Sequence, residues 1–281
     1  MERFEGPKST FVEVQGHRLH YLDWGNPQAP VMVLLHGFRS DAHSFGHFAR
    51  NIRAKYHLLA LDQRGHGDSA WVHDGYSRGS FAQEFEAFVR RLGLNDFILV
   101  GHPMGGMIGI GFAAAHPDMV RRLIIIDVGP GLNAEAIAHI RRQDLQVRGE
   151  FRSVEEAFAR VRERDPLLGD DALRYRVELA LKRLPAGKLT WKPDPTLAEV
   201  MRGRRRVSPD VIWGQLARVE CPSLLVRGGI SALMSRKLAQ RIVEVLPRRR
   251  MAEVPMAGHR VAADNPKGLA DAVTHFLEEP E

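Results

Sequence analysis

The stretch Ile98-Leu99-Val100-Gly101-His102-Pro103-Met104-Gly105-Gly106-Met107-Ile108 decides how the rest of the chain is organised. It begins with a short apolar run, which is typical of a buried β-strand. A glycine-rich turn follows, and residues 106–115 are small and mostly apolar, as in a helix that packs closely on its neighbours. The stretch therefore predicts a strand, a sharp turn and a helix.

Similar apolar runs and helical patterns alternate on both sides of this stretch. The runs that predict buried strands are Val31–Leu35, His57–Leu61, Leu123–Ile126, Ser223–Gly228 and Met251–Val254. Amphipathic helices are predicted over Ser80–Leu92, Met234–Leu246 and Asn265–Leu277, and a hairpin over Phe11–Val14 and Arg18–Asp23. Strands that alternate with helices predict an α/β fold with a mostly parallel sheet.

Composition excludes several function classes. The chain has 281 residues and a net charge of +6, but its arginines form short clusters along the whole length. This spread indicates a solvated surface and no nucleic-acid partner, and the alternative is an anionic ligand near Arg202–Arg206. No apolar segment approaches the roughly 18 residues of a membrane span. The absence of an apolar leader in Met1–Gly6 and the lone Cys221 predict a cytoplasmic protein without membrane contact.

The glycine-rich turn resembles the nucleophile elbow of the α/β-hydrolases, whose pattern is G-x-S-x-G. The residues that match the common form Gly-His-Ser-Met-Gly-Gly are Gly101, His102, Met104, Gly105 and Gly106. The loop at residues 62–69 is similar to the D-x-R-G-x-G-x-S loop of the same family. The resemblance implies an α/β-hydrolase fold, with a mostly parallel eight-stranded sheet flanked by helices and an inserted helical cap.

The cap is expected at residues 132–216, between core segments 1–131 and 217–281. No buried strand is evident there, and helices are predicted around Asn133–Arg142, Val154–Glu163, Asp171–Leu184 and Pro209–Leu216. Because caps of this family cover the active site, Trp191 and Trp213 are candidate pocket walls, as are His36 and His102 from the core. Alternatively, the two tryptophans only join the cap to the core.

Pro103 stands where the family has its serine. It has no hydroxyl, thiol or carboxylate, so it cannot be a covalent nucleophile. The elbow nucleophile also has a strained backbone with positive φ, whereas a proline ring holds φ near about −65°. We therefore expect Pro103 both to remove the nucleophile and to relax the turn.

Two further parts of the family's catalytic site are implied by the resemblance. His36-Gly37-Phe38 follows a buried strand at the place where the family builds half of its oxyanion hole. The backbone N–H groups of Phe38 and Met104 are then the expected oxyanion donors. The alternative is that this segment is only a tight turn.

Of the two remaining triad positions, one matches the family and the other does not. His259, in the loop after the last strand, matches the family's catalytic base, but Ala232 occupies the usual position of the acid in a loop of the form R-G-x-x-S-D. Some members of the family take the acid from the end of the strand after the elbow, where this chain has Asp127. Asp127 therefore either pairs with His259 or is only part of a common turn. His259 and Asp127 are the candidate catalytic residues.

Three functions stay open at this point, all with a small-molecule ligand. The first is a degenerate or non-hydrolytic protein that binds a small carbonyl compound under the cap. The second is a hydrolase or lyase that uses His259 as a general base without a covalent nucleophile. The third is a serine ester hydrolase inactivated by the substitutions at Pro103 and Ala232. The histidines have no metal-ligand spacing and Gly101–Gly106 has no nucleotide-binding spacing, so no metal or cofactor is predicted.

Overall fold

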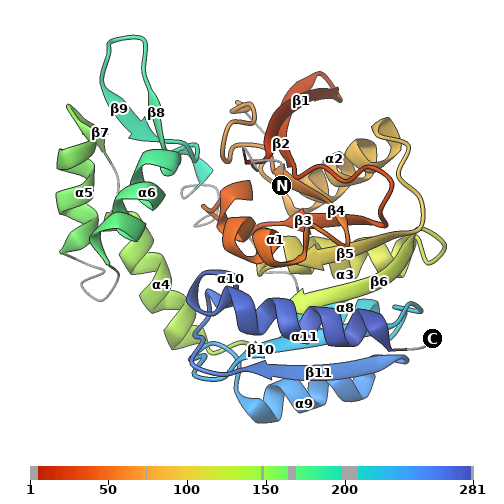
Figure 1. The fold of residues 1–281 in the computed structure, drawn as a ribbon. Coiled ribbons are helices and arrows are strands. Elements are labelled where there is room, and N and C mark those ends of the chain that lie inside the picture. The colour runs from red at the N-terminus through yellow and green to blue at the C-terminus, as the bar shows by residue number, and fades with distance from the viewer. Residues whose placement is uncertain (1–5, 74, 147–148, 164–168, 198–207, 280–281) are drawn as a thin grey trace.

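The computed structural model describes residues 6–73, 75–146, 149–163, 169–197 and 208–279. Its core is an eight-stranded sheet in the order β1-β2-β4-β3-β5-β6-β10-β11 (Figure 1). The strands are β1 (Lys8–Val14), β2 (His17–Asp23), β3 (Val31–Leu35), β4 (His57–Asp62), β5 (Phe97–Gly101), β6 (Val120–Ile126), β10 (Ser223–Gly228) and β11 (Arg249–Val254). Only the β1–β2 and β2–β4 pairs of this sheet are antiparallel. The predicted mostly parallel sheet is confirmed.

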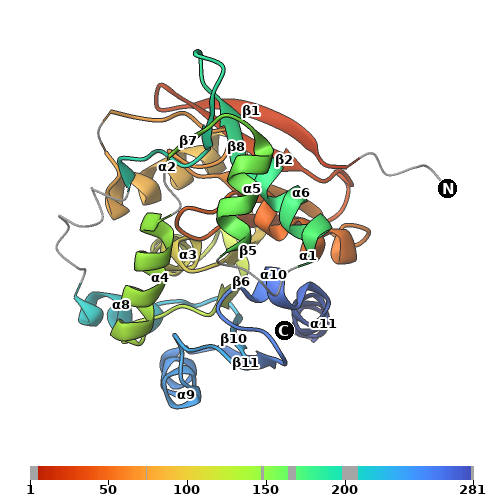
Figure 2. The ribbon, with the colours of Figure 1, turned by 90° about the vertical axis from the view of Figure 1, so that its left-hand side faces the viewer.

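Helices cover both faces of the sheet because side chains of the central strands alternate between two apolar clusters. Leu99 belongs to one cluster, and its neighbours Ile98 and Val100 belong to the other. The first cluster is covered by α2 (Arg78–Arg91), α3 (Met104–Ala115), α8 (Pro209–Leu216) and α9 (Arg236–Val245). The second is covered by α1 (Gly46–Ile52), which follows the short η1 (Ala42–Phe45), and by α10 (Val261–Asp264) and α11 (Pro266–Glu278). Figure 2 shows α9 and α11 on opposite sides of β10 and β11. None of the described helices is long and apolar enough to cross a bilayer.

The segment between β6 and α8 stands beside the carboxyl ends of the core strands (Figure 1). It contains α4 (Ala134–Gln146), α5 (Val154–Arg162) and α6 (Asp170–Ala180). It also contains a three-stranded sheet of β7 (Glu150–Phe151), β9 (Leu189–Trp191) and β8 (Leu181–Arg183). The expectation of helices alone, with one helix over Asp171–Leu184, is therefore wrong. Strands of two or three residues are too short to show a period, and the turn before β9 is made by Gly187 at φ 82°.

The small sheet is fastened to the loop that follows β4. The indole Nε1 of Trp71 donates a 2.8 Å hydrogen bond to the Lys192 carbonyl, and Lys192 forms a 2.6 Å ion pair with Asp68. The Tyr76 hydroxyl donates to the buried carboxylate of Asp194 at 2.5 Å. These contacts hold residues 192–194 against the core beside the carboxyl ends of the strands.

Candidate functional site

The turn after β5 is as tight as its glycines predict. A Cβ on Gly101 would lie 2.4 Å from the Gly106 nitrogen, and one on Gly105 would lie 2.2 Å from the Leu35 carbonyl oxygen. Real side chains do not tolerate such distances, so both positions require glycine. The turn therefore sits directly against the end of β3, as an elbow does.

Pro103 occupies the tip of this turn with a negative φ. Its φ is −26° and its ψ is −62°, so it lies outside the left-handed region, and it serves as the N-cap residue of α3. The ring offers no nucleophilic atom at the place where the turn presents its side chain. The site has to be explained without a covalent step at this position.

The loop after β3 is fastened to the elbow by backbone hydrogen bonds. The His102 N–H donates to the Leu35 carbonyl at 2.9 Å, and the Gly105 N–H donates to the His36 carbonyl at 3.1 Å. Within the described residues, the amides of Phe38 and Met104 donate to no protein acceptor. Two amides without protein partners, on segments joined in this way, are suited to bind an oxyanion.

His36 stabilises this loop through hydrogen bonds of its buried ring. Its side chain is fully buried, its Nδ1 donates to the Gly37 carbonyl at 2.7 Å, and its Nε2 accepts from the Gln63 N–H at 3.0 Å. Burial is the main cause that lowers the pKa of His36, so the ring is neutral at neutral pH. The expectation that His36 lines a pocket is wrong, because both ring nitrogens are occupied and none of its surface is exposed.

His259 and Asp127 meet at the centre of the site. His259 Nδ1 lies 2.9 Å from Asp127 Oδ2, and the Asp127 side chain has no exposed surface. Asp127 directly follows β6 and has φ 47°. His259 lies in the loop after β11, which approaches so closely that a Cβ on Gly228 would be 2.1 Å from the Gly258 carbonyl oxygen. The structure thus brings together the two candidate catalytic residues.

The Asp127 carboxylate is surrounded by donors. Its Oδ1 accepts from the Gly228 N–H at 3.1 Å, and its Oδ2 accepts from the Ser231 hydroxyl at 2.6 Å as well as from His259. Because a carboxylate oxygen accepts, Nδ1 is the donating nitrogen of His259, and in the neutral form of the ring the lone pair then lies on Nε2. No described residue hydrogen-bonds Nε2. This tautomer is the one that a general base requires.

Ala232 lies beside this pair without a polar contribution. It is exposed and lines a groove of about 520 Å³ together with His259. Residues of α4 form the opposite wall of the groove, among them Ala136, His139 and Ile140. The residue at the usual acid position therefore faces the groove that His259 also lines. The carboxylate that contacts His259 belongs to Asp127, at the end of β6.

The His102 ring packs against the His259 ring at a tilt of 40°. The two ring centroids are 4.9 Å apart, and His102 Nε2 donates a 2.7 Å hydrogen bond to the His259 carbonyl. Burial, together with the neighbouring His259, lowers the pKa of His102 to about 3. His102 is thus a neutral ring that holds the His259 loop against the elbow.

The two candidate tryptophans lie away from the groove. Trp191 packs edge-on against Phe151 inside the small sheet, with centroids 5.2 Å apart. Trp213 lies in α8 and packs against the first apolar cluster, and the guanidinium of Arg241 lies 4.7 Å from its ring centroid. Neither residue lines the groove beside His259. Trp213 packs on the core, as the alternative of a cap-to-core contact expected, whereas Trp191 packs on other residues of the segment between β6 and α8. The arginines at 202–206 lie outside the described residues.

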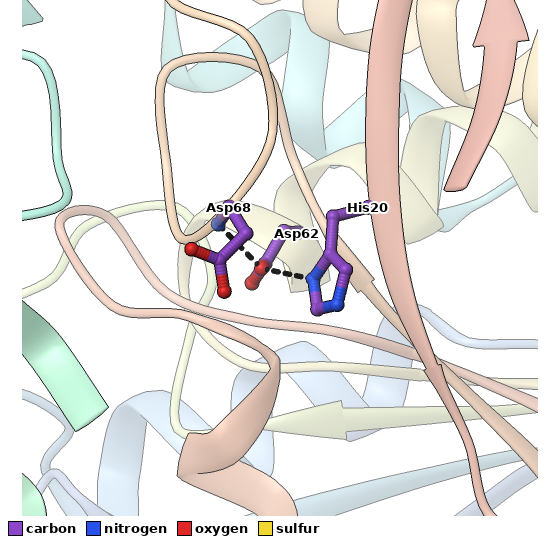
Figure 3. Close-up of side chains that lie close together, drawn as sticks. All are labelled: His20, Asp62 and Asp68. Atoms are coloured by element: carbon purple, nitrogen blue, oxygen red, sulfur yellow. Dashed lines mark hydrogen bonds and ion pairs between the residues drawn. The ribbon is translucent and has the colours of Figure 1, made fainter. Parts of the chain in front are cut away.

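A second cluster of polar residues lies between β2 and the loop after β4. His20, Asp62 and Asp68 bring possible metal-ligand atoms within 4.8 Å of one another (Figure 3). However, the Asp62 oxygens already accept from the Ala42 N–H at 2.7 Å, the His20 ring at 2.6 Å and the Asp68 N–H at 2.9 Å. Asp68 is neutralised by Lys192, and a cation bound here would be close to that ammonium group. The cluster is better explained as the hydrogen-bonded support of its loop.

The fold agrees with the comparison to known proteins. Residues 32–272 match the model of the Alpha/beta hydrolase family. The chain belongs to this family. As an alpha/beta hydrolase, it is 28% identical over 249 residues to 2-(acetamidomethylene)succinate hydrolase of Mesorhizobium japonicum, which covers 89% of this chain and 88% of that protein.

A further relative of this alpha/beta hydrolase and a solved structure support the assignment. The 3-hydroxybutyrate-oligomer hydrolase of Cupriavidus necator is 30% identical over 277 residues, covering 92% of this chain and 93% of that protein. The crystal structure of E-2-(acetamidomethylene)succinate hydrolase superposes with a TM-score of 0.86 at 27% identity, over 97% of this chain and 100% of that one. The predicted family and fold are confirmed.

Proposed function

We propose that this alpha/beta hydrolase acts on a small carbonyl compound, such as an ester or lactone, with His259 as general base and without a covalent enzyme intermediate. The observation that carries the proposal is the 2.9 Å contact between His259 Nδ1 and the buried Asp127 carboxylate. A protein that had only kept the fold for binding would have no need for a histidine whose Nδ1 is held by a buried carboxylate. We assign residues 132–216 as the cap over the substrate.

The reaction that fits these groups is the direct attack of water. Nε2 of His259 takes a proton from water as the water oxygen forms a bond to the carbonyl carbon. The electron pair of the carbonyl moves to its oxygen, which the Phe38 and Met104 amides stabilise. When the tetrahedral intermediate collapses, the bond to the leaving group breaks and that group takes the proton from His259. The products are a carboxylic acid and an alcohol.

This mechanism is tested by hydrolysis of a panel of p-nitrophenyl esters. We expect turnover by the wild-type chain that falls about 10²–10⁴-fold in His259→Ala, because a positioned base contributes that much. Asp127→Asn is expected to fall as well, because the amide does not hold the required tautomer. His275→Ala is the matched control, because the His275 side chain is 84% exposed on α11. Equal rates for the wild type and His259→Ala would refute the proposal.

A second candidate, ligand binding without turnover, is favoured by Pro103. With the nucleophile position occupied by a ring, an ester can bind beside the oxyanion donors and stay intact. If wild type and buffer give equal rates on every ester, this candidate replaces the first. The relatives named above are hydrolases, which favours turnover as the first experiment.

A further inference from the structure

We propose that Ser231 is a positioning residue for His259, acting through Asp127. The Ser231 hydroxyl lies 2.6 Å from Asp127 Oδ2, the same oxygen that His259 Nδ1 contacts at 2.9 Å. Its effect on turnover rests on the proposed function, whereas its effect on the hydrogen bond of His259 does not.

The direction of the hydroxyl proton follows from its surroundings. Ser231 is buried, and its Oγ accepts from the N–H groups of Leu233 at 3.2 Å and Met234 at 3.3 Å. A serine hydroxyl has two acceptor sites and one proton. Because both acceptor sites are occupied by backbone donors, the proton is left for Asp127.

The sheet explains why this contact forms. Strands β6 and β10 are parallel neighbours, with Ile126 opposite Val226, so the residues that follow each strand meet at one edge. Asp127 follows β6, and the turn after β10 carries Ser231. That turn is held in place by Arg227, which donates to the Met234 carbonyl at 2.8 Å and the Gly229 carbonyl at 3.0 Å.

The turn after β10 differs from the family pattern in what it offers His259. Its usual acid position is Ala232, which has no group to offer His259. The neighbouring Ser231 instead fixes the carboxylate that arrives from β6. With Gly228 on Oδ1 and Ser231 on Oδ2, both oxygens of the Asp127 carboxylate are held by donors from the β10 turn, and Oδ2 also contacts His259.

The test uses the full-length protein and the proton on His259 Nδ1. This proton is recorded by NMR on protein with labelled histidine, and its resonance is assigned by its loss in His259→Gln. In Ser231→Ala we expect the resonance to move or broaden, because Oδ2 loses its second donor. Ser235→Ala is the control: it also removes a serine hydroxyl from this turn, but Ser235 caps α9 by accepting from Leu238 N–H at 3.1 Å.

Ser231→Cys covers the case in which Ser231→Ala does not fold. The thiol keeps the buried volume but is a weak donor, so the same change in the resonance is expected. A resonance that stays at its wild-type position in the folded variant overturns the proposal. A resonance that changes equally in Ser235→Ala also overturns it, because the effect is then general to the turn.

Turnover separates this proposal from the function it refines. If the wild type hydrolyses esters, Ser231→Ala is expected to lower kcat on the order of tenfold at an unchanged KM, since a misplaced base slows the chemical step without weakening binding. If the wild type is inactive but the resonance responds, the hydrolytic function fails and the role of Ser231 stands. If the wild type is active and neither kcat nor the resonance responds, only the role of Ser231 fails.

Discussion

Asp127 Oδ2 lies 2.9 Å from His259 Nδ1, although the two residues are 132 positions apart in the chain. The contact requires β6 and β11 to end at the same edge of the sheet, on either side of β10. The carboxylate that contacts His259 therefore comes from the end of the strand after the elbow. The elbow tip, at Pro103, offers no reactive group of its own.

Pro103→Ser is expected to create a serine hydrolase. The new hydroxyl is placed at the elbow beside His259, so the variant should react covalently with a fluorophosphonate probe and hydrolyse p-nitrophenyl esters faster than the wild type. Pro103→Ala is the control, since it removes the proline ring without adding a nucleophile. Adding Ala232→Asp to Pro103→Ser should bring no further gain, because Asp127 already holds Nδ1 of His259. A large gain only in the double variant would show that Asp127 is not the working acid.

Gly105→Ala is expected to destabilise the fold. Its Cβ would lie 2.2 Å from the Leu35 carbonyl oxygen, so β3 and the elbow must separate, which costs about 1–3 kcal/mol in the free energy of unfolding. The matched control is Gly214→Ala in α8, where no atom lies within 4 Å of the added Cβ. That change should be stabilising by about 0.5–1 kcal/mol through helix propensity. Urea unfolding followed by circular dichroism measures both, and equal midpoints would contradict the expected contrast.

Asp41 is expected to make the protein less stable as the pH rises. Burial, and then the charge of Asp62, raise its pKa to about 7, with Lys192 acting in the opposite direction. The folded chain therefore keeps the Asp41 proton between about pH 4 and 7, while the unfolded chain has released it. Since the folded state binds more protons, this group favours folding at low pH, and that contribution is lost as the pH approaches 7.

The variant Asp41→Asn tests this sign. Between pH 5 and pH 8, the Tm of the wild type should fall more than the Tm of Asp41→Asn, because the amide does not titrate. The comparison is a difference between two pH values within each variant, so it is insensitive to a constant loss from the substitution itself. Parallel Tm profiles would show that Asp41 does not titrate in this range.

Asp194→Asn is expected to loosen the attachment of the small sheet to the core. The carboxylate is 6% exposed and accepts from the Tyr76 hydroxyl, and from the Thr196 hydroxyl and N–H at 2.8 Å. Replacing one oxygen by an N–H₂ group leaves a buried donor opposite another, at a cost of about 1–3 kcal/mol. Asp271→Asn is the control, because its ion pair with Lys267 is exposed and adds only about 0.3–0.5 kcal/mol. Limited proteolysis should cut the segment 149–194 faster only in Asp194→Asn.

Local patterns in the sequence were sufficient for the core and the elbow. The run 98–100 and the glycines that follow it specify a buried strand and a tight turn, because each depends on neighbours in the chain. The missing nucleophile follows from Pro103 alone. The pairing of Asp127 with His259 was one of two open interpretations, since a turn after a buried strand and an acid at its end have the same sequence.

The features that sequence reasoning missed depend on contacts between distant segments. Ser231 differs from other serines in its contact with Asp127, a residue 104 positions away in the chain. The one signal in the sequence is its place directly before Ala232 in the R-G-x-x-S-D pattern. The small sheet of β7, β8 and β9 was missed because each strand has at most three residues. The burial of His36 is another such feature. It depends on a contact with Gln63, which follows β4 and is 27 residues away in the chain, so the sequence around His36 does not indicate it.

The preserved surroundings of Pro103 also bear on the history of the chain. Proline and serine codons can differ by a single base, so one point mutation separates this elbow from one that carries a nucleophile. In such a mutant, the contact between Asp127 and His259 and the tight glycine turn would already be present. The present protein and its Pro103→Ser variant are therefore one substitution apart, and the activity of that variant measures how much of the difference from a serine esterase lies at this single residue.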